Sequence, residues 1–247
     1  DINGKIDLIS KINFNLNKKL KLNKLKYEID GKLEYLEIHA NKVATIKEYL
    51  PEFDSKIVLK DSKLKFSNLD NTHKLNLDGF IKVKDSFNSF KINEIYNNKK
   101  FIINGNVDLT KTKLKISKLN YNKEYGKKVE LTFDVNFILN KYYNLKKINL
   151  AANKSKIYLR DVKLNENFEI LNFKKIEVKT FLNNMKNNDF VVSKSKDIVI
   201  FGEVFDAEPL FKSLYKKNNR KIFAKKFNSG IKINFDRALS WSGDDIS

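Results

Sequence analysis

The eleven residues VELTFDVNFIL, at positions 129–139, show the pattern from which the fold class follows. Apolar side chains occupy the odd positions, namely Val129, Leu131, Phe133, Val135, Phe137 and Leu139. The even positions are polar except for Ile138. Successive side chains of a β-strand point to opposite faces, so this alternation predicts a half-buried strand about twice the usual length of five or six residues. Its apolar face needs a cover, which is a second sheet, a helix or a molecule that is not protein.

The same alternation recurs along the chain, separated by Gly, Asn and Asp. The segments are KIDLISKINFNL (5–16), LKYEIDGKLEYLEIHA (25–40), SKIVLKDSKLKFSNL (55–69), KLNLDGFIKVK (74–84), KFIINGNVDLTKTKLKISKLNY (100–121), KKINLAA (146–152), KSKIYLRDVKL (154–164), FEILNFKKIEVKTF (168–181) and KDIVIFGEVF (196–205). Strands at this spacing predict an all-β architecture of consecutive hairpins. We expect turns at Asp30-Gly31 and at Lys60-Asp61-Ser62.

Two stretches predict short helices instead. Residues 41–50 carry apolar side chains at helical spacing, and Pro51 ends the pattern. Residues 207–217 follow Asp206 as N-cap, with Pro209 in the first turn. We expect both helices to cover apolar parts of the sheet. Because no linker rich in Pro, Gly or Ser divides the chain, residues 1–247 are expected to form one continuous β unit.

The charge of the chain is strongly basic, with a formal net charge of +19. Only Arg160, Arg220 and Arg237 are arginines, although base readout and bidentate phosphate contacts favour the arginine fork. We therefore expect lysine-covered strand faces with weak attraction to anionic membranes. Nucleic acid is not an expected partner, and a basic nucleic-acid-binding surface stays the less favoured alternative function. The chain has no cysteine, which excludes disulfides and thiolate chemistry, and no run of about eighteen apolar residues.

Residue types that carry catalysis are scarce. His39 and His73 are the only histidines, and neither has a second His or Cys at ligand spacing. No G-x-S-x-G, Walker or G-x-G-x-x-G motif occurs, and the spacing of Asp108, Asp134 and Asp161 does not indicate a metal site. Asp206 and Glu208 open a helix, where capping explains them. We expect a protein that is not an enzyme and has no cofactor or metal.

Two alternative architectures account for how the apolar faces are covered. A closed β-sandwich fills its own core. A long antiparallel meander that curls into an open trough leaves the apolar face for a ligand. An acyl chain of about sixteen carbons would gain on the order of 10 kcal/mol there, at about 0.8 kcal/mol per buried CH₂.

A resemblance to a known family favours the trough. The stretch INGNVDLTKTKLKISKLNYNKEYGKKVELTFDVNF (103–137) resembles the AsmA-like, repeating β-groove envelope proteins of Gram-negative bacteria, which include TamB- and YhdP-like proteins. The matching positions are Asp108, Leu109, Thr110, Leu114, Ile116, Tyr121, Lys123 and Gly126. IVIFGEVFDAEPLF (198–211) is similar to that family's strand-to-helix passage, and IKEYLP (46–51) to its helix ending before proline. Tyr121 replaces a frequent Trp and Ser117 a proline, and lysine replaces many neutral residues.

The resemblance implies a periplasmic protein anchored in the inner membrane by a segment outside this chain. It also implies that the chain conducts phospholipid toward the outer membrane along a hydrophobic groove. It further implies that this sequence, which starts at Asp1 without a leader, is a middle section of a longer chain. The side chains expected to contact acyl chains are Val107, Leu109, Leu114, Ile116, Val129, Leu131, Phe133, Val135, Phe137, Ile148, Leu150, Ile157, Leu159, Ile176, Val178, Ile198 and Ile200. A structural or interaction β-domain with a self-filled core requires the same residues, so that alternative stays open.

Overall fold

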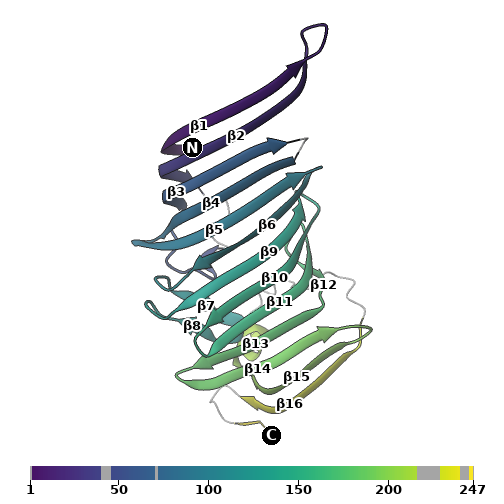
Figure 1. Ribbon diagram of the computed structural model, residues 1–247. Helices are drawn as coiled ribbons and strands as arrows, with labels where there is room; N and C mark the ends of the chain where they lie inside the picture. Colours follow the sequence, from purple (N-terminus) through teal and green to yellow (C-terminus); the bar gives the residue numbers. More distant parts are fainter. Residues whose placement is uncertain (1, 40–45, 70–71, 216–228, 240–244, 247) are drawn as a thin grey trace.

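One long, open β-sheet makes up most of the molecule (Figure 1). The computed structural model describes residues 2–39, 46–69, 72–215, 229–239 and 245–246. Fifteen strands join in this sheet, which begins at one end with β1 (Ile2–Leu16) and finishes at the other with β17 (Asp245–Ile246). The two end strands do not pair with each other. The expected open all-β sheet is thus confirmed, and the alternative of a closed sandwich is not what the described residues form.

The order of strands in the sheet follows the order in the sequence, as consecutive hairpins produce. Between the end strands lie β2 (Leu22–His39), β3 (Lys56–Leu69), β4 (Thr72–Val83), β5 (Ser86–Asn97), β6 (Lys100–Asp108), β9 (Val129–Ile138), β10 (Tyr142–Ala152), β11 (Ser155–Asn165), β13 (Lys175–Leu182), β14 (Met185–Lys194), β15 (Ile198–Asp206) and β16 (Ile231–Leu239), and β12 (Ile170–Asn172) pairs with β11. Neighbours run antiparallel except β15 and β16, which are parallel. The sheet is therefore a meander with one crossover near its C-terminal end.

A small excursion interrupts the meander between β6 and β9. It contains β7 (Leu114–Ile116), the 3₁₀ turn η1 (Ser117–Leu119) and β8 (Tyr121–Lys123). β7 and β8 pair with each other and not with the main sheet. We call residues 109–128 the plug, because they lie against one face of the sheet.

The stretch quoted first forms β9, as its alternation predicts. β9 pairs on one side with β6, where Phe133 lies opposite Gly105, and on the other with β10, where Phe133 lies opposite Ile148. Antiparallel partners opposite each other share a face, so the odd residues of β9 define the apolar face across its neighbours. The apolar face of the sheet is continuous across these strands.

Both predicted turns were wrong. β2 runs unbroken through Asp30 and Gly31, because ladders to β1 and β3 hold this segment extended on both sides. The chain reverses instead at residues 17–21, where the Asn17 carboxamide oxygen accepts hydrogen bonds from the backbone N–H groups of Lys19 (2.8 Å) and Lys21 (3.0 Å). At Lys60 to Lys63 the ladder of β3 shifts register, and Asp61 has φ of 47°. The Asp-Ser signal thus produces a bulge within a strand.

The helix predictions had different outcomes. α2 spans Glu208–Tyr215, which agrees with the helix expected at 207–217 as far as the described residues reach. Much of the helix expected at 41–50 lies outside the described residues, while Ile46 and Lys47 are helical. β5, β14 and β16 were not among the predicted segments.

Candidate functional site

A row of apolar side chains crosses ten strands on the apolar face, and we call it the central row. Cross-strand pairing joins Leu64, Leu77, Ile92, Gly105, Phe133, Ile148, Leu159, Ile176, Val192 and Ile200 in that order, from β3 to β15. Strands lie about 4.8 Å apart, so the row is about 40 Å long. Every one of its members is an apolar residue or glycine, so the register creates an apolar feature without a polar break.

The side chains of the central row are half-buried. The exposure of every member is intermediate along the whole row. By contrast, Val129 is 0% exposed and Leu150 is 9% exposed where the plug lies on them. Leu159, Ile176, Val192 and Ile200 pack against the buried cluster of Val162, Phe173 and Ile198, yet all four stay partly exposed. The described residues therefore cover the central row less completely than the plug covers its own part of the face.

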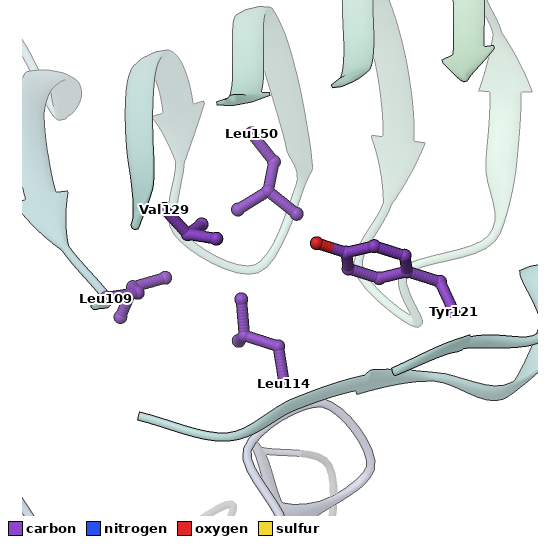
Figure 2. Packing of buried hydrophobic residues seen from close by; sticks show 5 residues of the cluster. All are labelled: Leu109, Leu114, Tyr121, Val129 and Leu150. Carbon is purple, nitrogen blue, oxygen red and sulfur yellow. The ribbon is translucent and has the colours of Figure 1, made fainter. Parts of the chain in front are cut away.

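The plug packs on one end of the strands and forms a small hydrophobic core with them (Figure 2). Leu109, Leu114 and Tyr121 come from the plug and meet Val129 and Leu150 of the sheet. Val107, Leu131 and Ile157 pack around this cluster. The apolar face therefore has a part that the plug covers, near the starts of β9 and β11, and a longer part that the described residues leave half-buried.

A buried lysine holds the plug in shape. The Lys123 ammonium donates hydrogen bonds to the backbone carbonyl oxygens of Leu109 (2.6 Å), Thr110 (2.8 Å) and Thr112 (2.5 Å). Burial lowers the pKa of this lysine from its ordinary value, while the three carbonyl oxygens are the acceptors that a protonated amine requires. Lys123 thus ties both sides of the plug loop together.

The residues before the plug close its loop. The Asp108 carboxylate accepts hydrogen bonds from the Thr110 backbone N–H (2.8 Å) and hydroxyl (2.5 Å), and these bonds lower the pKa of Asp108. The Gly126 N–H donates to the Thr110 carbonyl at 2.9 Å, with Gly126 at φ of 81°, a conformation that favours glycine. Residues of the quoted motif therefore have structural roles in the plug.

A polar cluster anchors the far side of the plug to β14 and β15. The carboxamides of Asn187 (3.3 Å) and Asn188 (2.9 Å) donate to the Leu119 carbonyl, and the carboxamide of Asn120 donates to Asp206 (3.1 Å) and Glu208 (3.0 Å). The Asp206 carboxylate also accepts from the Glu208 backbone N–H at 3.1 Å. Asp206 and Glu208 are therefore structural, as capping predicted.

Aromatic rings line the ends of the strands that lie away from the plug, on the same apolar face of the sheet. The stack runs through Tyr27, Phe66, His73, Tyr96, Phe101, Phe137, Tyr143 and Phe168, with ring centroids 4.6–6.0 Å apart. These residues lie near the turns that follow β3, β5, β9 and β11. We call this stack the aromatic row. His73 belongs to it within β4.

The structure divides the predicted acyl-contact residues into three groups. Half-buried on the apolar face of the sheet lie Val107, Leu131, Phe133, Val135, Phe137, Ile148, Ile157, Leu159, Ile176 and Ile200. Buried lie Leu109, Val129, Leu150, Val178 and Ile198. Leu114 and Ile116 belong to β7, in the plug rather than the main sheet, so they cover the face instead of lining it. The third group shows that alternation alone does not tell which sheet a strand joins.

Four side chains of the central row were not among the predicted acyl-contact residues, namely Leu64, Leu77, Ile92 and Val192. Ile92 lies in β5 and Val192 in β14, two strands that had not been predicted. The alternation FKINEIY around Ile92 was the available signal. In β14 the neighbouring residues Asn187 and Asn188 are both polar and both buried. The sequence of this strand therefore lacks the regular alternation of apolar and polar residues that predicts a strand.

The described residues include few groups of polar side chains with the arrangement that a metal or catalytic site requires. No group of three or more His, Asp or Glu side chains in the described ranges could hold a metal ion. His39 is exposed, and its Nε2 lies 3.8 Å from a Glu37 carboxylate oxygen. A hollow of about 370 Å³ lies mainly on the polar side of β5, β6 and β9, with Lys91, Asp108 and Glu130 in its wall.

Lysines on the polar face are paired with carboxylates at several places. Lys56 Nζ lies 2.6 Å from Glu37 Oε1, and Lys156 Nζ lies 3.3 Å from Glu177 Oε2. Pairs this exposed contribute about 1 kcal/mol or less each.

In the part that the structure describes, no helix is long and apolar enough to cross a bilayer. No protein-family model, curated protein or solved structure matches this chain.

Proposed function

We propose that this chain binds acyl chains of phospholipid on the apolar face of its open sheet and performs no catalysis. The observation that carries this proposal is the central row, which is apolar for about 40 Å and stays half-buried, whereas the plug end is fully covered. A continuous apolar surface of this length is unusual on a solvent-exposed side of a protein unless a partner or ligand covers it.

The dimensions support acyl chains as the ligand. The hydrocarbon core of a bilayer is about 30 Å thick, so one leaflet's chains extend about 15 Å. The central row is long enough for more than one such chain. Each CH₂ that leaves water contributes about 0.8 kcal/mol, so even a partly covered chain binds favourably.

The side chains of the central row offer no directional contact. They carry no charge and no hydrogen-bonding group, so an acyl chain meets similar surroundings at each strand. Such a surface stabilises a bound chain without holding it at one place. We therefore propose transfer of lipid along the sheet as the mode of action.

The cellular setting of the proposal rests on the family resemblance. The motif residues Asp108, Thr110, Lys123 and Gly126 build the plug, and the matching passage at 198–211 leads from β15 into α2. We propose a periplasmic location, an inner-membrane anchor outside this chain, and lipid exchange between the inner and outer membranes.

A second candidate is a structural or interaction domain with a self-filled core. The plug favours it locally, because Leu114 and Tyr121 bury Val129 completely. It predicts that the chain purifies without lipid. The two candidates thus differ at the central row and not at the plug.

Native mass spectrometry of the purified chain separates the two candidates. The lipid proposal predicts adducts with the mass of phospholipid, and it predicts that Leu159→Lys removes them. Leu159 lies in the central row and is half-buried, so a lysine there keeps its ammonium in water. Phe80→Lys is the matched control, because Phe80 is 43% exposed and its neighbours Asp78 and Lys82 share its face. A lipid-free wild-type chain would refute the lipid proposal.

A further inference from the structure

A second row of side chains lies between the central row and the aromatic row on the apolar face. Cross-strand pairing joins its members from β2 to β11 in the order Ile29, Phe66, Leu75, Glu94, Ile103, Val135, Leu145 and Val162. On β5 the member of this row is two residues from Ile92 of the central row and two residues from Tyr96 of the aromatic row. All members of the second row are apolar except Glu94.

The register of β5 fixes Glu94 on the apolar face. Glu94 lies opposite Leu75 of β4 and Ile103 of β6, and neither of these two ladders shifts register. Residues opposite each other share a face, and so do residues two apart on one strand. The ring of Tyr96, two residues further on, lies 4.6 Å from the ring of Phe101, which confirms the face. A carboxylate therefore stands among the side chains of the apolar face.

The Glu94 carboxylate has no partner among the described residues. Its side chain is half-buried, and no hydrogen bond or ion pair joins it to another described residue. On the polar face, by contrast, the Glu37 carboxylate lies 2.6 Å from the Lys56 ammonium. A carboxylate among apolar side chains loses contact with water, and only a cation or a hydrogen-bond donor offsets that loss. The surroundings of Glu94 therefore favour a cation that a ligand brings.

Aromatic rings beside Glu94 offer a second contact to a cation. Tyr96 follows Glu94 on the same face of β5, about 7 Å along the strand, and Phe101 lies opposite Tyr96 on β6. Ring faces attract ammonium groups, and aromatic residues recognise quaternary ammonium ligands in this way. A carboxylate next to a pair of rings is thus suited to an ammonium group, either primary or quaternary.

A metal ion fits this position less well than an ammonium group. Calcium takes six to eight oxygen ligands, and Glu94 supplies at most two. In the ranges that the structure describes, no three His, Asp or Glu side chains are grouped so that they could hold a metal ion. An ammonium group needs one carboxylate and is further stabilised by the rings.

The place of Glu94 beside the central row connects the ammonium to a lipid. Ile92 of the central row is two residues from Glu94 on the same face, on the side away from Tyr96. A zwitterionic phospholipid joins an ammonium group to its acyl chains through phosphate and glycerol. A molecule whose acyl chain lies on the central row can therefore place its head group at Glu94.

We infer that Glu94, together with Tyr96 and Phe101, binds the ammonium group of a zwitterionic phospholipid whose acyl chain lies on the central row. This inference rests on the proposed lipid binding and adds head-group selectivity to it. The central row offers an acyl chain similar surroundings at every strand, whereas Glu94 gives β5 a preferred position for the head group. Ethanolamine and choline head groups share the required chemistry, and phosphatidylglycerol lacks it.

Competition between lipids tests the role of Glu94. The purified chain is incubated with vesicles that contain equal amounts of phosphatidylethanolamine, phosphatidylcholine and phosphatidylglycerol with identical acyl chains, and native mass spectrometry counts the lipids bound. Glu94→Gln should lower the ratio of zwitterionic lipid to phosphatidylglycerol about tenfold. The lysines of the chain attract phosphatidylglycerol in wild type and variant alike, so the change in this ratio reports the carboxylate.

Glu28→Gln is the matched control, because it removes the same charge from an exposed side chain on the polar face of β2. Its lipid ratio should stay within about twofold of wild type, since exposed charges there are screened by solvent. Circular dichroism with urea unfolding checks that both variants are folded. A drop in the ratio as large for Glu28→Gln as for Glu94→Gln would show that net charge sets the ratio, and it would overturn the inference.

Substitution of Tyr96 separates the two head groups. Tyr96→Leu should lower the bound phosphatidylcholine about threefold, because a quaternary ammonium depends on the ring faces, and Tyr96→Phe should retain it. Phosphatidylethanolamine should change less, because a primary ammonium donates hydrogen bonds to the carboxylate. An effect of Glu94→Gln on either zwitterionic lipid supports the inference and identifies which ammonium binds.

Two results would overturn the inference, and they differ in what they mean for the proposed function. If wild type and Glu94→Gln bind the three lipids in the same ratio, lipid binding stands and head-group recognition fails, so that water or a cation of another kind is the partner of Glu94. If wild type binds none of the three lipids, the proposed function and this inference fail together.

Discussion

At the scale of single residues, the motif side chains maintain the shape of the plug. Lys123 is 5% exposed and satisfies three carbonyl oxygens, and Asp108 with Thr110 closes the loop that leads to them. The sequence identified these residues by resemblance, but it could not indicate that they act on the backbone. A lysine in an alternating stretch normally indicates a solvated side chain.

Replacing Lys123 with methionine should destabilise the chain by about 2–4 kcal/mol, because buried carbonyl oxygens lose their donor. Lys113→Met is the control, since Lys113 is exposed and pairs with Glu52 at 3.7 Å, and it should cost less than about 1 kcal/mol. Urea unfolding followed by circular dichroism measures both changes. Equal losses would show that the three hydrogen bonds contribute nothing specific.

Within the aromatic row, Phe101 lies between Tyr96 (4.6 Å) and Phe137 (4.8 Å). Phe101→Leu keeps an apolar side chain but removes both ring contacts, so we expect a loss of about 1–2 kcal/mol. Phe101→Tyr retains the ring and should remain within about 0.5 kcal/mol of wild type, which the same unfolding assay can resolve. If leucine is tolerated as well as tyrosine, the stacking has no energetic role.

At the scale of elements, alternation predicted β9, β10 and β11 because one face of each is apolar and the other polar. It misplaced the turns at Asp30-Gly31 and Lys60-Asp61-Ser62, because strands on both sides of β2 and β3 override local turn preference. It also could not separate β7 from the main sheet, since Leu114 and Ile116 alternate as they would in either sheet. The period of the pattern identifies which side chains of a strand share a face. The pairing partners of the strand determine which sheet that face belongs to.

Two leucines on the neighbouring strands β10 and β11 test which part of the face is covered. Leu150→Lys buries an ammonium under the plug and should cost more than about 3 kcal/mol. Leu159→Lys should cost about 1 kcal/mol, because Leu159 is only half-buried and a lysine there keeps its ammonium in water. Chemical denaturation of the two variants provides the comparison, and a similar large loss for both would mean that the central row is covered too.

At the scale of the whole molecule, the sheet stays open from β1 to β17, so its apolar face is not closed by a second layer of described residues (Figure 1). The strand patterns predicted this one-sided sheet, and the pairing register adds the central row and the aromatic row that borders it. Neither row was predictable in full, because β5 and β14 complete the central row and were not recognised. The molecule thus presents a long apolar surface between a plug at one side and a line of rings at the other.

Site-specific photo-crosslinking to radiolabelled phospholipid in vesicles tests the central claim most directly. A photoreactive residue at Leu159 reports on the apolar face, and one at Arg160, the next position on β11, reports on the polar face of the same strand. Probes at Leu77 and Ile200 report on distant strands of the central row. The account predicts lipid labelling at Leu159, Leu77 and Ile200 with none at Arg160, and equal labelling at Leu159 and Arg160, or none at either, would contradict it.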